Sequence, residues 1–165
     1  MKFLLTLFSF LLCFVAGNAQ TNGAFTHNGS TRTFITYVPS TYNPNTPVPL
    51  VLVLHGLTMS GNSIMSVTGF NSLAETNHFI AVYPDGLNND WNFGGTGASN
   101  TDDVSFLNAL IDSMATHYNI APDKLYSCGF SAGGFMSYRM ACESGRCFAA
   151  IASVSGTMGT SVYTS

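Results

Sequence analysis

The sequence predicts an α/β fold in which helices cover both faces of a mostly parallel central sheet, giving a three-layer sandwich. Short apolar runs typical of buried strands alternate with segments of helical spacing, and one run, Leu50–Leu54, is apolar at every position. A strand that is apolar on every residue is covered on both faces, as in parallel sheets. Strands that alternate with helices form βαβ units, whose crossovers place helices against the sheet.

The first predicted strand is Thr33–Val38, which is rich in β-branched and aromatic residues and is followed by a Pro- and Asn-rich loop up to Pro49. Leu50–Leu54 is the second, bounded by Pro49 and Gly56. Three further apolar runs are predicted as strands: Phe79–Tyr83, Leu125–Phe130 and Ala149–Val154. The four strands from Leu50 onward are expected to form one parallel sheet.

Three segments between these strands have helix-compatible spacing: Ile64–Thr76, Val104–Tyr118 and Gly133–Cys142. Asp102 or Asp103 is available as the N-terminal cap of the second helix. The segment Leu87–Asn100 is rich in Asn and Gly and is predicted to be a long loop. No repeat, linker or low-complexity run marks a second domain, so residues 20–165 are predicted to form one domain.

Residues 1–19 have the pattern of a secretory signal peptide. Lys2 supplies the positive end, Phe3–Val15 the apolar centre, and Ala19 ends a small-residue cleavage site. The alternative is a membrane anchor, but the apolar run is shorter than the ~20 residues of a spanning helix. The mature chain is therefore expected to begin at Gln20, to be extracellular or periplasmic, and to keep no stable membrane anchor.

The composition argues against several function classes. Five Lys plus Arg face eight Asp plus Glu, a formal net charge of −3, so a nucleic-acid partner is not expected. No segment has the ligand spacing of a metal site or the pattern of a phosphate-binding loop, so neither a metal nor an organic cofactor is expected. With 46% hydrophobic and 8% charged residues, the chain is expected to bury a core.

Three cysteines follow the predicted cleavage site, in a chain expected to reach an oxidising compartment. Cys128 lies in an apolar run and is predicted to be a buried thiol rather than a reactive one. Cys142 and Cys147 flank a helix-ending turn, and we hypothesise that they form a local disulfide. The odd number leaves open a partner in a longer chain.

The motif with the clearest chemistry is Gly129-Phe130-Ser131-Ala132-Gly133, which follows a predicted strand and opens a predicted helix. In that context a Gly-x-Ser-x-Gly pattern indicates a nucleophile on a sharp, strained turn. Gly129 and Gly133 would let the strand and the helix approach closely. The alternative is a Gly-rich turn with a capping serine. Ser131 is the candidate nucleophile.

A nucleophile that attacks a carbonyl group needs donors for the developing oxyanion. His55-Gly56-Leu57 directly follows a predicted buried strand, and the backbone amides of Leu57 and Ala132 are the candidate donors. Gly56 permits close backbone approach. His55 is expected to support the loop rather than act as a base, and a simple role at the strand end stays open.

No Asp and no His follow Ser131, and all four histidines precede it. A serine hydroxyl is a poor nucleophile unless an imidazole takes its proton. Enzymes with this serine turn place the acid and then the histidine after the serine. The chain is therefore expected to be an N-terminal fragment, or the truncated product, of a longer enzyme that is incomplete at its C-terminus.

Several motifs together resemble the polyhydroxybutyrate depolymerase and feruloyl esterase group, which are secreted serine esterases of the α/β-hydrolase fold. They are Tyr83-Pro84-Asp85-Gly86, Trp91-Asn92, Asp102–Leu107 and the run from Gly129 to Arg139. The similarity extends from about Gly29 to Met158. It implies the N-terminal part of an α/β-hydrolase sandwich, because the acid and the histidine of that group come later in the chain.

The resemblance implies an ester substrate attached to a polymer: acetyl or feruloyl groups on plant polysaccharides, short polyhydroxyalkanoates, or small aryl esters. Trp91 either lines the acyl or sugar site or packs against the sheet. Asp102 and Asp103 are expected to cap the helix and bond the loop rather than act as the acid. The alternatives to an esterase are a non-catalytic polysaccharide-binding protein and a serine peptidase of the same fold.

Overall fold

The computed structural model describes residues 19–159. Six strands form one sheet: β1 (Gln20–His27), β2 (Ser30–Tyr37), β3 (Val48–Leu54), β4 (Ile80–Pro84), β5 (Ile120–Phe130) and β6 (Ala150–Val154). The helices of this part of the chain are α1 (Gly61–Thr68), α2 (Phe70–Asn77), α3 (Asp103–His117) and α4 (Ala132–Glu143), with one 3₁₀ turn at Leu87–Asn89.

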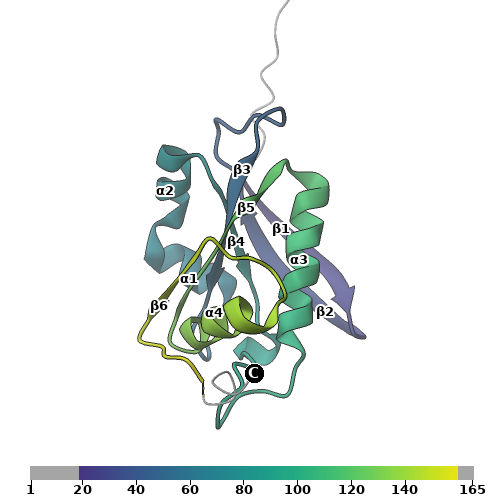
Figure 1. The fold of residues 1–165 in the computed structure, drawn as a ribbon, viewed down its shortest axis with the longest axis vertical. Helices are drawn as coiled ribbons and strands as arrows, with labels where there is room; N and C mark the ends of the chain where they lie inside the picture. Colours follow the sequence, from purple (N-terminus) through teal and green to yellow (C-terminus); the bar gives the residue numbers. More distant parts are fainter. Residues whose placement is uncertain (1–18, 160–165) are drawn as a thin grey trace, which may run out of the picture.

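The strand order is β1-β2-β4-β3-β5-β6 (Figure 1). The pairs β4–β3, β3–β5 and β5–β6 are parallel, so the predicted four-stranded parallel sheet is confirmed. The pairs β1–β2 and β2–β4 are antiparallel. Because β3, β4 and β5 run in the same direction, their carboxyl ends meet at one edge of the sheet, where ligand sites of open α/β sheets lie.

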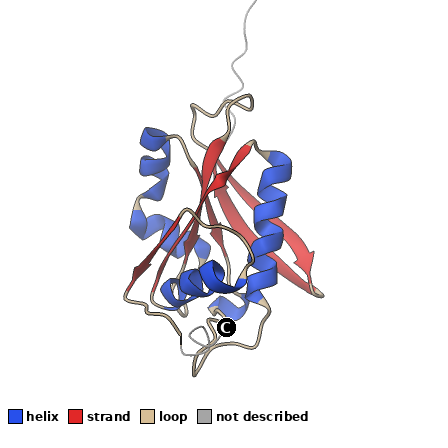
Figure 2. Ribbon diagram, viewed as in Figure 1, coloured by secondary structure: helices blue, strands red, loops and turns tan. Residues whose placement is uncertain are grey.

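Alternate side chains of β3 enter two separate cores. Leu50, Leu52 and Leu54 pack with residues of α3 and α4. Val51 and Val53 belong to a second core that includes Ile64 of α1. Figure 2 shows the helices on both sides of the sheet. The continuous apolar run at 50–54 therefore indicated correctly a strand covered on both faces, and the three-layer α/β fold is confirmed.

Three details differ from the prediction. β1 was not predicted, because it is polar and pairs along one side only, with β2. β5 begins at Ile120, before the predicted Leu125. The predicted helix Ile64–Thr76 is two helices, α1 and α2, because Gly69 between them has a φ of 67° and ends α1 in the left-handed conformation.

The β6 edge of the sheet is open on the side of α1 and α2. Val154 is 61% exposed and Phe130 41% exposed. These two residues border an apolar hollow of about 330 Å³, whose other walls include Val53, Ile64, Val67 and Phe70. Within residues 19–159, no helix combines the length and the apolar character needed to cross a bilayer.

Candidate active site

Ser131 lies at a sharp corner between β5, which ends at Phe130, and α4, which begins at Ala132. Its backbone has a φ of 50° and a ψ of −115°, outside the regions that residues other than glycine ordinarily adopt. Such strain persists only where the surrounding structure enforces it, and it is concentrated at functional sites. The predicted strained turn is therefore present, and a capping serine in an ordinary turn does not describe this backbone.

The two glycines of the motif bring strand and helix together. A Cβ on Gly129 would overlap the backbone of Gly133, and a Cβ on Gly133 would overlap the carbonyl oxygens of Leu54 and His55. The start of α4 therefore lies directly against the end of β3. This contact places Ser131 beside the loop that follows β3.

We expect Gly133→Ala to lower the free energy of unfolding by about 2–3 kcal/mol, because the added methyl meets backbone atoms rather than a side chain that can move. Denaturant unfolding followed by circular dichroism measures this change. The control is Gly145→Ala, where nothing lies within 4 Å but φ is 69°, so that left-handed strain of about 1 kcal/mol acts alone. Equal losses in the two variants would contradict the steric account.

The peptide between Gly56 and Leu57 is held in one orientation. The Gly56 carbonyl oxygen accepts hydrogen bonds from His55 Nδ1 at 2.8 Å and from the Met59 amide at 3.1 Å. In a trans peptide the N–H points away from the C=O, so the Leu57 amide is directed away from these partners. Among the described residues, the amides of Leu57 and Ala132 have no hydrogen-bond partner. Each of these two amides is therefore available to donate to a ligand oxygen.

His55 is fully buried and neutral. Its Nε2 accepts a hydrogen bond from the Gly86 amide at 2.9 Å, so the proton is on Nδ1, which donates to Gly56. Its ring lies 4.9 Å from that of Trp91. Burial lowers the pKa of His55, against smaller opposing effects of the Gly56 bond and nearby aspartates. With both nitrogens engaged, His55 supports the loop and is not positioned as a base.

We expect the protein to lose stability as the pH falls below about 6.5, partly through His55. A pKa that is lower in the folded state than in the unfolded state gives stability that is present above the unfolded value and lost as protonation sets in. The slope for one group is at most about 1.4 kcal/mol per pH unit. Urea unfolding between pH 8 and pH 5 measures it.

His55→Gln should flatten this slope. His117→Gln is the control, because His117 is exposed and its Nδ1 lies 2.8 Å from the Ser113 carbonyl oxygen. If His55→Gln and the unsubstituted protein showed the same pH dependence, the neutral, buried state of His55 would be wrong.

Trp91 does not line a substrate site. Its side chain is fully buried, and its indole N–H donates to the His55 carbonyl oxygen at 2.9 Å. The alternative of packing against the sheet is the correct one. The physical reason is that the indole covers the end of β3 and shields His55 from solvent, so Trp91 supports the loop from within the core.

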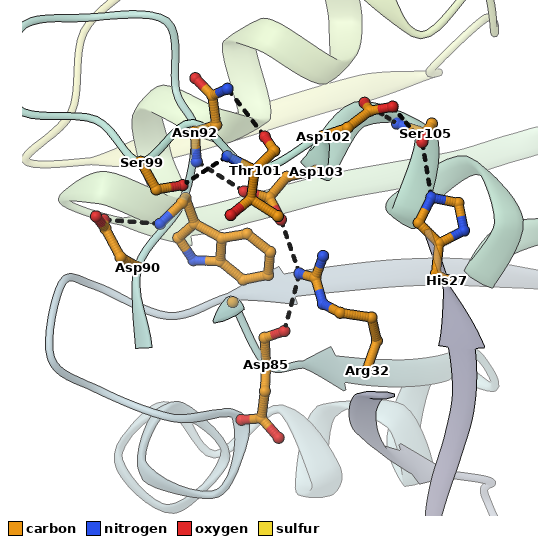
Figure 3. A network of polar contacts seen from close by, with 12 residues as sticks. His27, Arg32, Asp85, Asp90, Asn92, Ser99, Thr101, Asp102, Asp103 and Ser105 are labelled. Atoms are coloured by element: carbon orange, nitrogen blue, oxygen red, sulfur yellow. Dashed lines mark hydrogen bonds and ion pairs between the residues drawn. The ribbon is translucent and has the colours of Figure 1, made fainter. Parts of the chain in front are cut away.

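A buried polar network joins β2, α3 and the loop after β4 (Figure 3). Arg32 forms an ion pair with Asp103 at 2.7 Å, and both side chains are at most 2% exposed. Asp103 Oδ2 accepts from the Asn92 amide at 2.7 Å, and the Asn92 carbonyl oxygen accepts from Arg139. Burial raises the pKa of Asp103, while Asn92 and Arg32 act in the opposite direction. The network fixes the loop beside α4.

Asp102 caps α3, because its side chain accepts from the Ser105 amide at 3.2 Å. The predicted roles of Asp102 and Asp103 in capping and loop bonding are therefore confirmed. Sequence reasoning missed Arg32 as the partner of Asp103. The available signal was an arginine directly before the first predicted strand, in a chain that has only five Lys and Arg residues in total.

None of the four histidines hydrogen-bonds to Ser131. His27, Ser105 and Asp102 are joined by hydrogen bonds and are the residue types of a catalytic triad. Here, however, the serine lies between the histidine and the aspartate, whereas in a triad the histidine lies between the other two. The hydroxyl of Ser105 donates to Asp102 at 2.7 Å, so it accepts from His27 Nε2 at 2.7 Å. An imidazole that donates to a hydroxyl cannot deprotonate it. This chain therefore does not activate Ser105.

The hypothesised disulfide between Cys142 and Cys147 is absent: both are exposed free thiols. Helix α4 continues through Cys142, and the following turn is held by other contacts. Arg146 bonds to Asn108 Oδ1 at 2.8 Å and to Asp112 at 2.6 Å. Cys128 is a half-buried free thiol, and burial raises its pKa to about 12, as expected for an unreactive cysteine. Residues 19–159 contain no group of three or more His, Cys, Asp or Glu placed so that it could hold a metal ion.

Comparisons with known proteins identify a family and several relatives of this chain. The model of the Esterase family, described as "Putative esterase", matches residues 26–162. A bifunctional acetylxylan esterase/xylanase of Neocallimastix patriciarum is 35% identical over 133 residues, which is 78% of this chain and 18% of that protein. Feruloyl esterase C of Emericella nidulans is 31% identical over 142 residues, 82% of this chain and 50% of that protein.

The chain spans half or less of the length of these curated relatives. The solved structure of an acetyl xylan esterase from Aspergillus awamori superposes with a TM-score of 0.68 at 21% identity, covering 84% of this chain and 53% of that one. This likeness shows the α/β-hydrolase fold. Because the family match runs from β1 through every later element to the segment after β6, this chain belongs to the Esterase family.

Proposed function

We propose that the chain supplies the nucleophile and the oxyanion-binding half of a secreted serine esterase. The observation that carries the proposal is the strained corner at Ser131, set against a loop whose Leu57 amide is free, with the free Ala132 amide directly following the serine. A serine on a strained strand-to-helix corner, followed by one unpaired amide and beside the loop that carries another, fits the arrangement needed for attack on a carbonyl carbon.

In the proposed reaction, the Ser131 hydroxyl attacks the ester carbonyl carbon and its proton passes to an imidazole. The Leu57 and Ala132 amides donate to the oxyanion of the tetrahedral intermediate. When the intermediate collapses, the alcohol leaves with the proton, and an acyl-enzyme remains. Water repeats the attack, releases the acid and restores the serine. No step requires a metal or an organic cofactor.

The imidazole and the carboxylate that orients it are proposed to come from protein beyond the sequence printed here. Two observations support this proposal. Each of the four histidines hydrogen-bonds to a residue other than Ser131, and the chain spans only half of the length of feruloyl esterase C. Export is proposed from the signal-like residues 1–19, of which 1–18 lie outside the described residues.

The proposed substrates are carboxylic esters on plant polysaccharides. The relatives named above are acetylxylan and feruloyl esterases, which supports acetyl and feruloyl groups as the acyl part. Polyhydroxyalkanoate esters are the second polymer class that the sequence resemblance implies. The chain is poor in charged residues, which suits a neutral polymer.

The test is covalent labelling of a full-length version with an alkyl fluorophosphonate, together with hydrolysis of para-nitrophenyl acetate and methyl ferulate. We expect a phosphonyl adduct on Ser131, located by peptide mass spectrometry, and loss of hydrolysis in step with labelling. An adduct on any other residue would overturn the assignment.

A second candidate, a non-catalytic polysaccharide-binding protein, is favoured by the absence of an imidazole beside Ser131 among the described residues. It predicts polysaccharide binding with neither labelling nor hydrolysis. The strained corner argues against it, because binding alone gives no reason to retain a conformation that costs on the order of 1–3 kcal/mol.

A further inference from the structure

Two hollows that share lining residues lie between the β1–β2 hairpin, the start of α1 and the turn after β4. Their volumes are about 280 and about 460 Å³, which is comparable with known ligand sites. Thr33, Ser60 and Asp85 line both hollows, and we refer to the two together as the trough. The larger hollow also has an apolar wall that includes Phe34 and Ile35, and four asparagines are among the other lining residues: Asn22, Asn62, Asn88 and Asn89.

The side-chain amides of these four asparagines have no hydrogen-bond partner among the described residues. Several asparagines elsewhere are engaged within the protein, such as Asn71 with Tyr83 and Asn119 with Pro44. Each free amide offers two donors and one acceptor. The trough therefore presents a row of neutral donors and acceptors that the fold itself does not use.

This chemistry fits a neutral polyol better than an anion. Sugar hydroxyls donate and accept together, as side-chain amides do. The trough exposes no lysine or arginine, since Arg32 at its base is 2% exposed and paired with Asp103. The carboxylate of Asp85 already accepts from the Gly61 amide and from Thr33 Oγ1, at 2.7 and 2.6 Å. An anion would meet this carboxylate without a balancing cation.

The trough reaches the candidate active site at its Asn88–Asn89 end. The Asn89 carbonyl oxygen accepts from the Thr58 amide at 2.9 Å, and Thr58 directly follows Leu57. Asn88, Asn89 and Thr58 all have left-handed backbones, with φ values of 57°, 60° and 65°. Strain in three residues on two facing segments indicates that this junction is held in a required shape.

We propose that the trough binds the saccharide chain that bears the ester, a neutral pentose or hexose oligosaccharide, and leads it toward Ser131. This inference rests on the proposed function, because it assigns the trough to the saccharide part of the ester substrate. Asn88 and Asn89 are the specificity-determining residues nearest the reacting centre. Asn22 and Asn62 contact sugar units further along the chain.

The test is a titration of the ¹⁵N-labelled protein with xylotetraose, followed by the side-chain amide signals of the asparagines. We expect saturable shifts of the Asn88 and Asn89 signals with a Kd on the order of 1 mM. The double variant Asn88→Gly/Asn89→Gly should weaken binding about tenfold through the loss of two hydrogen bonds. Glycine adopts left-handed backbone conformations readily, so these substitutions preserve the turn.

Asn28→Gly is the matched control, because Asn28 has a φ of 46° and lies in the hairpin turn outside both hollows. It should bind xylotetraose as the unsubstituted protein does. Asn62→Ala, on an exposed helical position, should weaken binding less than the double variant. Shifts that do not saturate, or an affinity that the double variant retains, would overturn the assignment, as would saturable binding of inorganic phosphate in the trough.

Saccharide binding and covalent labelling separate this inference from the proposed function. Ser131→Ala should retain the affinity for xylotetraose. If Ser131 is labelled and the oligosaccharide does not bind, the trough assignment fails and the esterase stands. If the oligosaccharide binds with the expected variant effects while Ser131 resists labelling, the trough assignment stands and the esterase fails.

Discussion

In the full-length protein, Ser131→Ala is expected to abolish fluorophosphonate labelling and to reduce ester hydrolysis by at least about 10³-fold. The reason is that the acyl-enzyme forms on this one hydroxyl, while the proposed hydrogen bonds from the amides of Leu57 and Ala132 polarise an ester without forming a covalent bond to it. Folding should be little changed, because Ser131 Oγ makes no hydrogen bond within the described residues. Intact-mass spectrometry and hydrolysis of para-nitrophenyl acetate provide the two measurements.

Ser105→Ala is the informative control. Ser105 contacts a histidine and an aspartate, and a search for triads by residue type alone would select it. Its proton is donated to Asp102, and it lies within α3 rather than at a strained corner. Labelling and hydrolysis should therefore persist in Ser105→Ala. Their loss there, with retention in Ser131→Ala, would transfer the nucleophile to α3 and reject the corner as the reacting site.

The parts of the fold that the sequence predicted are those set by local pattern. Leu50–Leu54 is apolar at every residue, and that alone implies cover on both faces. The corner at Ser131 follows from small residues at fixed positions, since any side chain at Gly129 or Gly133 would meet backbone. The free amide of Ala132 follows from the same turn, and that of Leu57 from the loop after β3; both are main-chain groups that need no particular side chain.

The parts that were missed depend on pairs of residues far apart in the chain. Arg32 and Asp103 are 71 positions apart, and nothing in either neighbourhood identifies the other. The trough draws its asparagines from a strand, a helix and a turn, so no single motif contains them. The disulfide prediction relied on the expected oxidising compartment and on two cysteines that flank one turn, while the turn after α4 is held by Arg146.

Asp103→Asn is expected to lower the free energy of unfolding by about 3–5 kcal/mol, since it leaves the buried guanidinium of Arg32 without a counter-charge. The asparagine keeps an oxygen for the Asn92 amide, so the variant removes the charge and preserves that bond. Surface pairs contribute far less: Asp112→Asn, which breaks the exposed pair with Arg146, should cost no more than about 1 kcal/mol. Urea unfolding of both variants measures the difference.

Arg32→Met tests the same pair from the other side, and its pH dependence has a defined sign. Burial raises the pKa of Asp103 even with Arg32 present, so without Arg32 the carboxyl should bind a proton more readily in the folded state than in the unfolded state. A raised carboxyl pKa gives stability that is present at low pH and lost as the pH rises through the folded value. Arg32→Met should therefore be less destabilised at pH 4.5 than at pH 7.

The double variant Arg32→Met/Asp103→Leu removes both charges of the ion pair. It shows whether charge balance or the hydrogen bond from Asn92 contributes more to the stability of the protein. Arg32 Nε is buried without a hydrogen-bond partner, so the cost of removing the guanidinium from water is only partly offset. Its guanidinium also lies 3.7 Å from the centre of the Phe106 ring, a surface that a methionine can cover. The double variant should be more stable than Asp103→Asn. If it is less stable, the hydrogen bond from Asn92 to the carboxylate, rather than the charge balance, holds the loop after β4 in place.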